Sequence, residues 1–228
     1  MKALSFRLMG AMAHFRKVFS NSTSLSYYFP PRTTLMGVVA AAMGKDRDSY
    51  YEELNQFEYS LTPLTGLRKI MLGETYLDTD EVSVKSLRRL KQGVPTGREF
   101  VLPSNAPFLG YRVTVYPFHE VMEKSLRSPV YPLSLGTANM LAWVEDVKVE
   151  ECEEIQEVDG EVMSVTQLKP EVTKDMRVAI EEMVPREFDA ERHTGELPTY
   201  FVELNAKPLT VKGKGRGLRC GGENYLFL

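Results

Sequence analysis

The first ten residues alternate between apolar and other side chains. Leu4, Phe6 and Leu8 fall at every second position of the segment 2–10, while Arg7 and its neighbours lie between them. A period of two places alternate side chains on opposite faces of a strand. The pattern therefore predicts a strand with one buried face at the start of the chain.

A helical period follows in the segment 35–43. Its apolar residues recur at steps of three and four, so they form one face of a helix. Pro30 and Pro31, followed by two threonines, are a typical helix start, and Gly44 is a typical residue just beyond a helix end. We predict a helix between these signals.

The remaining elements of residues 1–140 are weaker but ordered. The patterns predict a second helix at 48–57, strands at 59–64, 67–76 and 111–118, and a helix at 121–126. The last helix completes a β-α-β-β-α-β order, the split βαβ arrangement. The predicted fold class is α+β.

The C-terminal part has the pattern of strands. Apolar and polar residues alternate at 141–149, 199–204 and 225–228. We predict that 141–228 forms a smaller, β-rich region packed on the first domain.

A basic stretch interrupts the first domain between two predicted strands. It has turn residues in its middle, at Gly93, Pro95 and Gly97. We predict a projecting hairpin or mobile loop, a "thumb", at about 84–107.

Charge is unevenly distributed along the chain. The 228 residues carry a net charge of −3, which by itself argues against a general nucleic-acid binder. Residues 1–45 nevertheless contain six basic residues and no acid, and basic residues also dominate 85–112 and 207–219. Acids gather at 145–161 instead. Two interpretations stay open: solvated faces of opposite sign, or basic segments that bind a polyanion.

The composition argues against a metal site and against a membrane-spanning segment. The two cysteines, Cys152 and Cys220, are far apart and form no CxxC pair, and the three histidines are scattered. The longest nearly uncharged run near the start, 35–44, is too short to span a bilayer. We expect a cytoplasmic protein with reduced thiols, no metal, no cofactor and no membrane contact.

The predicted helix start is the first candidate site. Arg32, Thr33 and Thr34 would offer a positive charge and hydroxyl donors beside free helix N–H groups, which suit a phosphate. Tyr27 and Tyr28 just before it could stack on bases. The alternative is an ordinary capped helix with two core tyrosines.

Two further basic segments offer candidate sites. Basic side chains at 85–98 could follow a nucleic-acid backbone, or the segment could be a solvated loop. The glycine-rich run 213–222 could approach a phosphate closely, or could simply connect to the last strand. It lacks the residue spacing of a P-loop or of the dinucleotide-binding motif.

Catalytic signals are few. The chain has no Gly-x-Ser-x-Gly motif and no cysteine next to a histidine. His14, with Tyr27 or Tyr28 and a lysine, could form a metal-independent set that cleaves RNA. His119 is interpreted as a structural histidine.

Four motifs in order resemble a known family. They are Phe6-x-Leu8-x-Gly10-x-x-Ala13-x-Phe15-Arg16, then Ser26-Tyr27-x-Phe29-Pro30-Pro31-Arg32-Thr33-Thr34-Leu35-x-Gly37-Val38, then Gly97-Arg98-Glu99-Phe100-Val101-Leu102, and Pro129-Val130-Tyr131-Pro132-Leu133-Ser134-Leu135-Gly136. The set resembles the CRISPR-associated "Cas-five" family of the RAMP superfamily. The matches span residues 6–136.

The resemblance implies a ferredoxin-like, RRM-type domain with a thumb. It implies a subunit of a type I Cascade complex that grips the 5-prime handle of the CRISPR RNA, next to the backbone subunit and the large subunit, with target DNA reached through the complex. The RNA-binding residues expected on this basis are Arg16, Lys17, Tyr28, Arg32, Thr33, Thr34, Arg88, Arg89, Lys91, Arg98 and Tyr131.

One departure bears on catalysis. A branch of the family that cleaves precursor CRISPR RNA uses a tyrosine, a lysine and a histidine, with the lysine and the histidine adjacent to each other. This sequence has no Lys-His pair. Here the nearest counterpart is Pro117-Phe118-His119. We therefore expect a non-catalytic RNA-binding subunit. A metal-independent endoribonuclease centred on His14 is the alternative, and a protein-interaction module without RNA contact is a third hypothesis.

Overall fold

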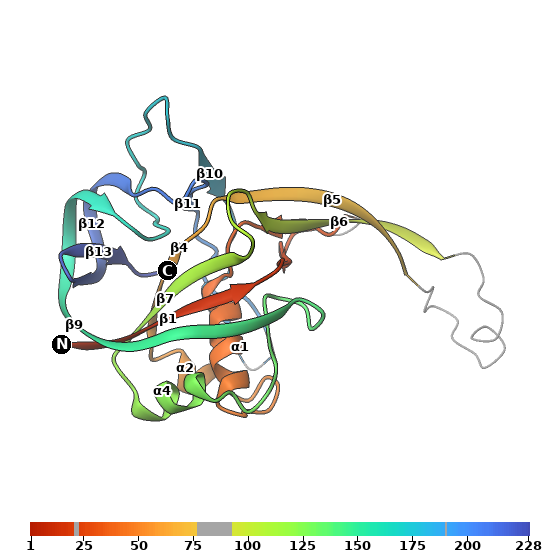
Figure 1. Ribbon diagram of the computed structural model, residues 1–228, viewed down its shortest axis with the longest axis horizontal. Coiled ribbons are helices and arrows are strands. Elements are labelled where there is room, and N and C mark those ends of the chain that lie inside the picture. The colour runs from red at the N-terminus through yellow and green to blue at the C-terminus, as the bar shows by residue number, and fades with distance from the viewer. Residues whose placement is uncertain (21–22, 77–92, 190) are drawn as a thin grey trace.

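The computed structural model describes residues 1–20, 23–76, 93–189 and 191–228. Within them, a curled antiparallel sheet forms the centre of the molecule (Figure 1). Its strand order is β13-β12-β9-β1-β7-β4, and β8 pairs with β9. The bounds are β1 Lys2–Gly10, β4 Glu58–Pro63, β7 Leu109–Tyr116, β8 Leu133–Ser134, β9 Leu141–Val162, β12 Leu209–Cys220 and β13 Glu223–Leu226.

The predicted first strand is confirmed, and it lies at the centre of the sheet. β1 pairs with β7 on one side and with β9 on the other. Leu4, Phe6 and Leu8 are almost fully buried and belong to the main hydrophobic core. Because these three residues share one face, that face of β1 borders the main core.

The helices lie below one face of the sheet (Figure 1). The predicted main helix is confirmed as α1, Arg32–Ala42, and the predicted later helix as α4, Glu120–Arg127. The second predicted helix is much shorter than 48–57, because α2 covers only Tyr51–Leu54. Asp48 just before it has a positive φ of 64°, which no helix contains.

A long hairpin projects from the body (Figure 1). It consists of β5, Leu67–Tyr76, and β6, Val94–Pro103, paired over their whole length. The sequence predicted a separate strand at 67–76 and a thumb starting near 84. The structure corrects this: the strand is the first half of the thumb, while residues 77–92 lie outside the described part of the chain.

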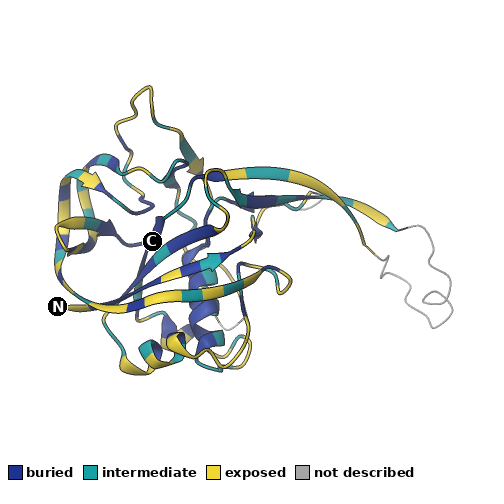
Figure 2. Ribbon diagram, viewed as in Figure 1, coloured by how far each residue is buried: buried dark blue, intermediate teal, exposed yellow. Residues whose placement is uncertain are grey.

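The C-terminal region extends the sheet and covers part of it. The second half of β9 pairs with β12, which pairs with β13. Smaller pairs form between β10, Val178–Glu181, and β11, Tyr200–Glu203, and between β2, Phe15–Arg16, and β3, Ser26–Tyr27. β9 thus takes part in both regions, and the division at residue 140 stays a prediction. Figure 2 shows burial concentrated between sheet and helices, with exposed residues along the outer hairpin.

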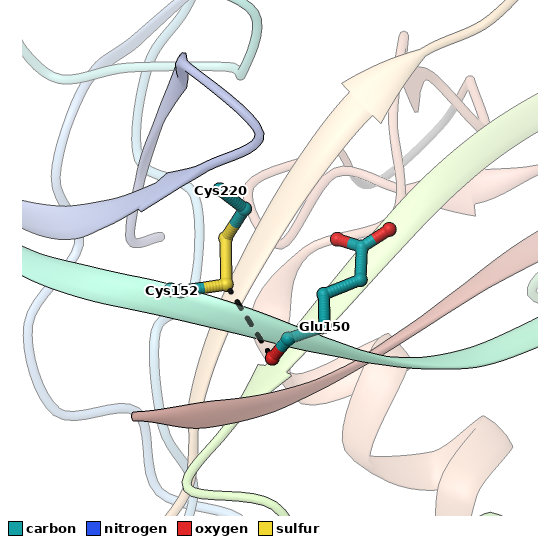
Figure 3. A group of neighbouring side chains, drawn as sticks. All are labelled: Glu150, Cys152 and Cys220. Carbon is teal, nitrogen blue, oxygen red and sulfur yellow. Dashed lines mark hydrogen bonds between the residues drawn. A yellow bond between two sulfur atoms is a disulfide. The ribbon is translucent and has the colours of Figure 1, made fainter.

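The expectation of reduced thiols is wrong for this structure. Cys152 of β9 and Cys220 of β12 are joined by a disulfide of 2.08 Å (Figure 3). They are direct cross-strand partners with Cα atoms 4.4 Å apart, at the short end of the range for disulfides. The sequence concealed this pair, because 68 positions separate the two residues and only the strand register brings them together.

Candidate nucleic-acid interface

The basic N-terminal loop lies against the base of the thumb. Ala13 and Val101 exchange two backbone hydrogen bonds of 2.9 Å. The Ser24 N–H donates to the Gly97 carbonyl, and the Glu99 N–H donates to the Ser24 carbonyl, both at 2.9 Å. The two acid-poor segments that are some 80 positions apart in the sequence are therefore joined in space.

Two carboxylates hold this junction together. Glu181, on β10 and only 1% exposed, lies 2.5 Å from the Lys17 ammonium and 3.2 Å from the Lys69 ammonium. Glu99 lies 3.3 Å from Lys69 and accepts a 2.8 Å hydrogen bond from the Ser26 N–H. The loop, the thumb and the C-terminal region thus share one ion-pair network. Neither Glu181 nor Lys69 was among the residues predicted from the sequence.

The two tyrosines before α1 have different environments. Tyr27 is fully buried and its hydroxyl donates to the Met183 carbonyl; burial raises its pKa to about 12. Tyr28 is half-buried, and the Lys69 ammonium lies 4.0 Å from its ring centroid. Burial also raises the pKa of Tyr28, and Glu181 acts in the same direction. Tyr27 is thus a core residue, whereas Tyr28 faces the junction.

Arg98 connects the thumb to the turn after β8. It is 7% exposed, lies 3.2 Å from Glu74 and donates a 2.7 Å hydrogen bond to the Thr137 hydroxyl. Its guanidinium also lies 5.2 Å from the centroid of Phe100. The preceding Gly136 has a φ of 97°, and a Cβ there would lie 1.9 Å from the backbone oxygen of His14. Only glycine fits this close approach.

His14 is enclosed at the same junction. It is 2% exposed, its Nδ1 lies 2.7 Å from the Glu99 carbonyl, and its Nε2 lies 2.9 Å from the Ser24 hydroxyl. Burial lowers its pKa, and the positive charge of Arg98 adds to that effect. Both ring nitrogens are occupied, so His14 holds the loop against the thumb.

The structure buries Arg32, which the sequence placed at a phosphate site. The guanidinium donates to the backbone oxygens of Asn55, Phe57 and Arg186 at 2.8 to 3.0 Å and is 4% exposed. Burial lowers its pKa, although Glu58 opposes that shift. Its phosphate role stays a prediction, and its burial and its partners argue against it.

Thr33 and Thr34 line a cavity of about 390 Å³ at the start of α1, together with Tyr50 and Arg192. No side chain caps the helix there. Tyr131 is 47% exposed, but its N–H donates to the Ala41 carbonyl near the opposite end of α1. Ala41 and Pro132, the residue after Tyr131, line the same cavity as the two threonines.

The other predicted residues divide into two groups. Arg16 is exposed beside the thumb, and its guanidinium donates to the Ser20 carbonyl at 3.1 Å. Arg88, Arg89 and Lys91 lie outside the described residues. Arg68 of β5, which the sequence analysis missed, is also exposed at the thumb base. Its signal in the sequence was a basic residue at a strand start, which is too common to single out.

The glycine-rich run 213–222 is mostly strand, which removes it as a phosphate loop. The basic residues of β12 lie opposite acids of β9: Lys212 opposite Asp159, Lys214 opposite Glu157 and Arg219 opposite Glu153. Arg216 lies 3.1 Å from Glu58 and 3.6 Å from Glu154. The basic tail and the acidic segment of the sequence thus neutralise each other across two strands.

Two clusters among the described residues have the composition of a metal site: an exposed one, Asp189, Glu191 and His193, and one that includes the two cysteines. The Glu150 carboxylate lies near Cys152 and Cys220 (Figure 3). The Cys152 sulfur lies 3.8 Å from the backbone oxygen of Glu150. With both sulfurs in a disulfide, neither offers a thiolate to a metal ion.

Comparisons with known proteins agree with the fold. The structure is similar to the crystal structure of a CRISPR protein from Archaeoglobus fulgidus, with a TM-score of 0.59 and 17% identity over 100% of this chain and 99% of that chain. It is also similar to a chain of a CRISPR RNA-guided surveillance complex, with a TM-score of 0.54 and 14% identity over 92% of this chain and 91% of that chain. Among curated proteins, none matches.

In the described residues, no helix has the length and apolar character needed to cross a membrane.

The family match settles the resemblance noted in the sequence. Residues 3–211 match the family described as CRISPR-associated protein (Cas_Cas5). The chain therefore belongs to the Cas_Cas5 family of CRISPR-associated proteins.

Proposed function

We propose that this chain is a non-catalytic CRISPR RNA-binding subunit of a type I Cascade complex, and that it grips the 5-prime handle of the guide. The observation that carries the proposal is the backbone pairing of the N-terminal loop with the thumb at Ala13–Val101 and Ser24–Gly97. It joins two acid-poor segments into one surface, as a polyanion requires. The backbone subunit and the large subunit are the proposed protein partners, with target DNA reached through the complex.

The strand order supports a ferredoxin-like, RRM-type domain. α1 lies between β1 and β4 in the chain, α4 lies between β7 and β9, and the strands are arranged β9-β1-β7-β4. That is the order expected of a split βαβ unit. RRM domains commonly bind single-stranded RNA.

The proposed contacts are distributed around the junction. Arg16 contacts a phosphate, because its guanidinium is exposed. Lys17 lies next to it and acts as a positioning residue, since its ammonium is held by Glu181. Tyr28 lies beside a base. Arg98 acts as a positioning residue for the thumb, since its guanidinium is engaged by Glu74 and Thr137.

Three thumb residues and two helix residues complete the proposed interface. Arg88, Arg89 and Lys91 of the thumb bend the RNA at the junction of handle and guide. Thr33 and Thr34 hold a handle phosphate from the cavity at the start of α1. Arg32 is left out because its donors are used inside the protein.

The absence of catalysis is supported by the surroundings of the candidate residues. Both nitrogens of His14 are hydrogen-bonded, and the hydroxyl of Tyr27 is turned inward to Met183. His119 lies at the start of α4, where its Nδ1 accepts from the Met122 N–H at 3.4 Å. A general acid or base needs a free nitrogen within reach of the scissile phosphate.

The test is a titration of labelled repeat RNA with the protein in EDTA, with binding and cleavage measured together. We expect saturable binding of intact RNA, with a log affinity that falls by about 0.7 per log unit of salt for each phosphate contacted. Arg16→Ala should reduce that slope by about 0.7. Arg219→Ala, on β12 at the opposite end of the molecule from the thumb (Figure 1), is the control and should leave the slope unchanged.

Two results would contradict the proposal. Equal effects of the two substitutions would exclude the thumb junction as the RNA surface. Discrete cleavage at one position, abolished by His14→Ala, would instead make the chain a metal-independent endoribonuclease.

A further inference from the structure

The two edges of the thumb differ in their free backbone groups. On β6, the backbone N–H and C=O groups of Gly97, Glu99 and Val101 point away from β5. All three residues are hydrogen-bonded through these groups to the N-terminal loop. Pro95 lies on the same side, two residues earlier, and has no N–H to offer. The β6 edge is thus covered near the body and blocked by proline beyond it.

Among the described residues, the β5 edge has a backbone partner only at Leu67. The Leu67 N–H points away from β6 and donates to the Leu204 carbonyl at 2.7 Å. Backbone direction alternates along an antiparallel strand, so residues 69, 71, 73 and 75 point their N–H and C=O groups to the same side. Within the described part of the chain, none of those groups has a backbone partner.

The side chains along this edge are apolar and unusually exposed. Met71 is 49% exposed on one face, and Leu72 and Tyr76 are 46% and 44% exposed on the other. Val94 of β6, opposite Tyr76, is 46% exposed. Natural edge strands are normally protected by lysine, proline or a bulge. Here the only lysine, Lys69, is held in ion pairs at the thumb base.

We propose that the outer edge of β5 is a docking site for an extended segment of another protein chain, which adds a third strand to the thumb. A two-stranded ribbon is marginal in water, and a third strand would pair the open groups and cover the apolar side chains. The inference rests on the proposed function, since it supposes a neighbouring protein subunit in the RNA-guided complex.

The chemistry of the edge selects the occupant. From 70 to 76 the strand has no basic residue and one acid, Glu74, which does not suit an RNA backbone. Arg68 is exposed and has no carboxylate partner among the described residues. The expected partner strand therefore carries apolar side chains at alternate positions and a carboxylate where it passes Arg68.

Gly73 gives a matched pair of variants. Its N–H points to the open edge, and an added Cβ would meet nothing within 4 Å. Gly73→Ala keeps the N–H, whereas Gly73→Pro removes it and puts a ring in the path of an incoming strand. Neither change removes a hydrogen bond between β5 and β6, so both variants should fold.

The experiment compares the isolated chain with the complex assembled from guide RNA and co-expressed partner subunits. Residue-resolved amide exchange should show Met71, Gly73 and Thr75 exchanging fast in the isolated chain and protected in the complex. Gly73→Pro should weaken incorporation into the complex by about tenfold, and Gly73→Ala by less than about twofold. Both variants should bind repeat RNA like the wild type.

Three outcomes would overturn the inference. Fast exchange of these amides in the assembled complex would show an unoccupied edge. Protection that rises with concentration in the isolated chain would identify a second copy as the occupant. Protection by guide RNA alone would make the edge an RNA contact. A wild-type chain that binds no repeat RNA would refute the proposed function instead. If a partner protein still protected the amides of Met71, Gly73 and Thr75, the docking site would remain supported.

Discussion

Glu181 is the residue whose charge the thumb junction depends on. Its carboxylate is almost fully buried and lies within 3.2 Å of both Lys17 and Lys69, whose side chains are only 16% and 12% exposed. Glu181→Gln keeps the size of the side chain but leaves two buried ammonium groups without their shared counter-charge. Removing one partner of a buried ion pair costs about 3–5 kcal/mol.

Lys69 keeps a second carboxylate, Glu99 at 3.3 Å, so we take the lower value of about 3 kcal/mol. For a chain of this size, that corresponds to a loss of about 6–12 °C in Tm. The measurement is thermal unfolding followed by circular dichroism at neutral pH. The matched control is Glu120→Gln, because Glu120 and Lys124 form an exposed ion pair of 2.6 Å on α4. Surface pairs contribute little, so its Tm should not change measurably.

Equal Tm values for Glu181→Gln and Glu120→Gln would refute the reasoning. That result would mean that Lys17 and Lys69 remain solvated, and that the network does not hold the loop, the thumb and β10 together.

Three other perturbations have defined outcomes. Burial lowers the pKa of His14, so the unfolded chain binds a proton at this histidine more readily than the folded chain does. The free energy of unfolding, measured with urea, should therefore be at its full value above about pH 6.5 and fall below it. His14→Gln should remove this dependence on pH. Replacing Cys152 and Cys220 together by alanine should cost about 4 kcal/mol, estimated from the loop entropy of a 68-residue separation. Dithiothreitol should lower only the wild-type Tm, so the difference between wild type and variant should disappear in its presence. Gly136→Ala should destabilise the fold by at least about 2 kcal/mol, because it combines a positive φ with a Cβ 1.9 Å from a backbone oxygen. Gly73→Ala is the control and should be nearly neutral. Similar Tm values for the two variants would contradict this account.

Local patterns predicted the elements well where the core imposes a clear period. The strand at 2–10 and the helix before Gly44 are confirmed as β1 and α1, because their apolar residues all face one core. The short α2 was overestimated, since the turn at Asp48 leaves no sign in hydrophobic spacing. The thumb was located, but its first strand was assigned to the body, because a projecting strand and a sheet strand share the same period of two.

The candidate site could be predicted only in part. Tyr28 was named from the predicted helix start and Arg16 from the family resemblance, and both lie at the junction. Arg32 looked like a phosphate ligand because its sequence context is a helix start, yet its guanidinium turns inward to the backbone of Asn55 and Phe57. No local pattern in the sequence identifies Glu181 as part of the junction, because its partners are more than 100 positions away.

The sequence by itself determined the local elements, the family and the segregation of charge along the chain. Those properties depend on residue order over short distances, where sterics and burial of one face act directly. The tertiary structure alone decided which charges meet, since strand register places the basic residues of β12 opposite the acids of β9. The same register joined Cys152 to Cys220 and, among the described residues, left the β5 edge without a backbone partner beyond Leu67 while closing that of β6. These outcomes depend on the pairing of distant segments, which no local pattern specifies.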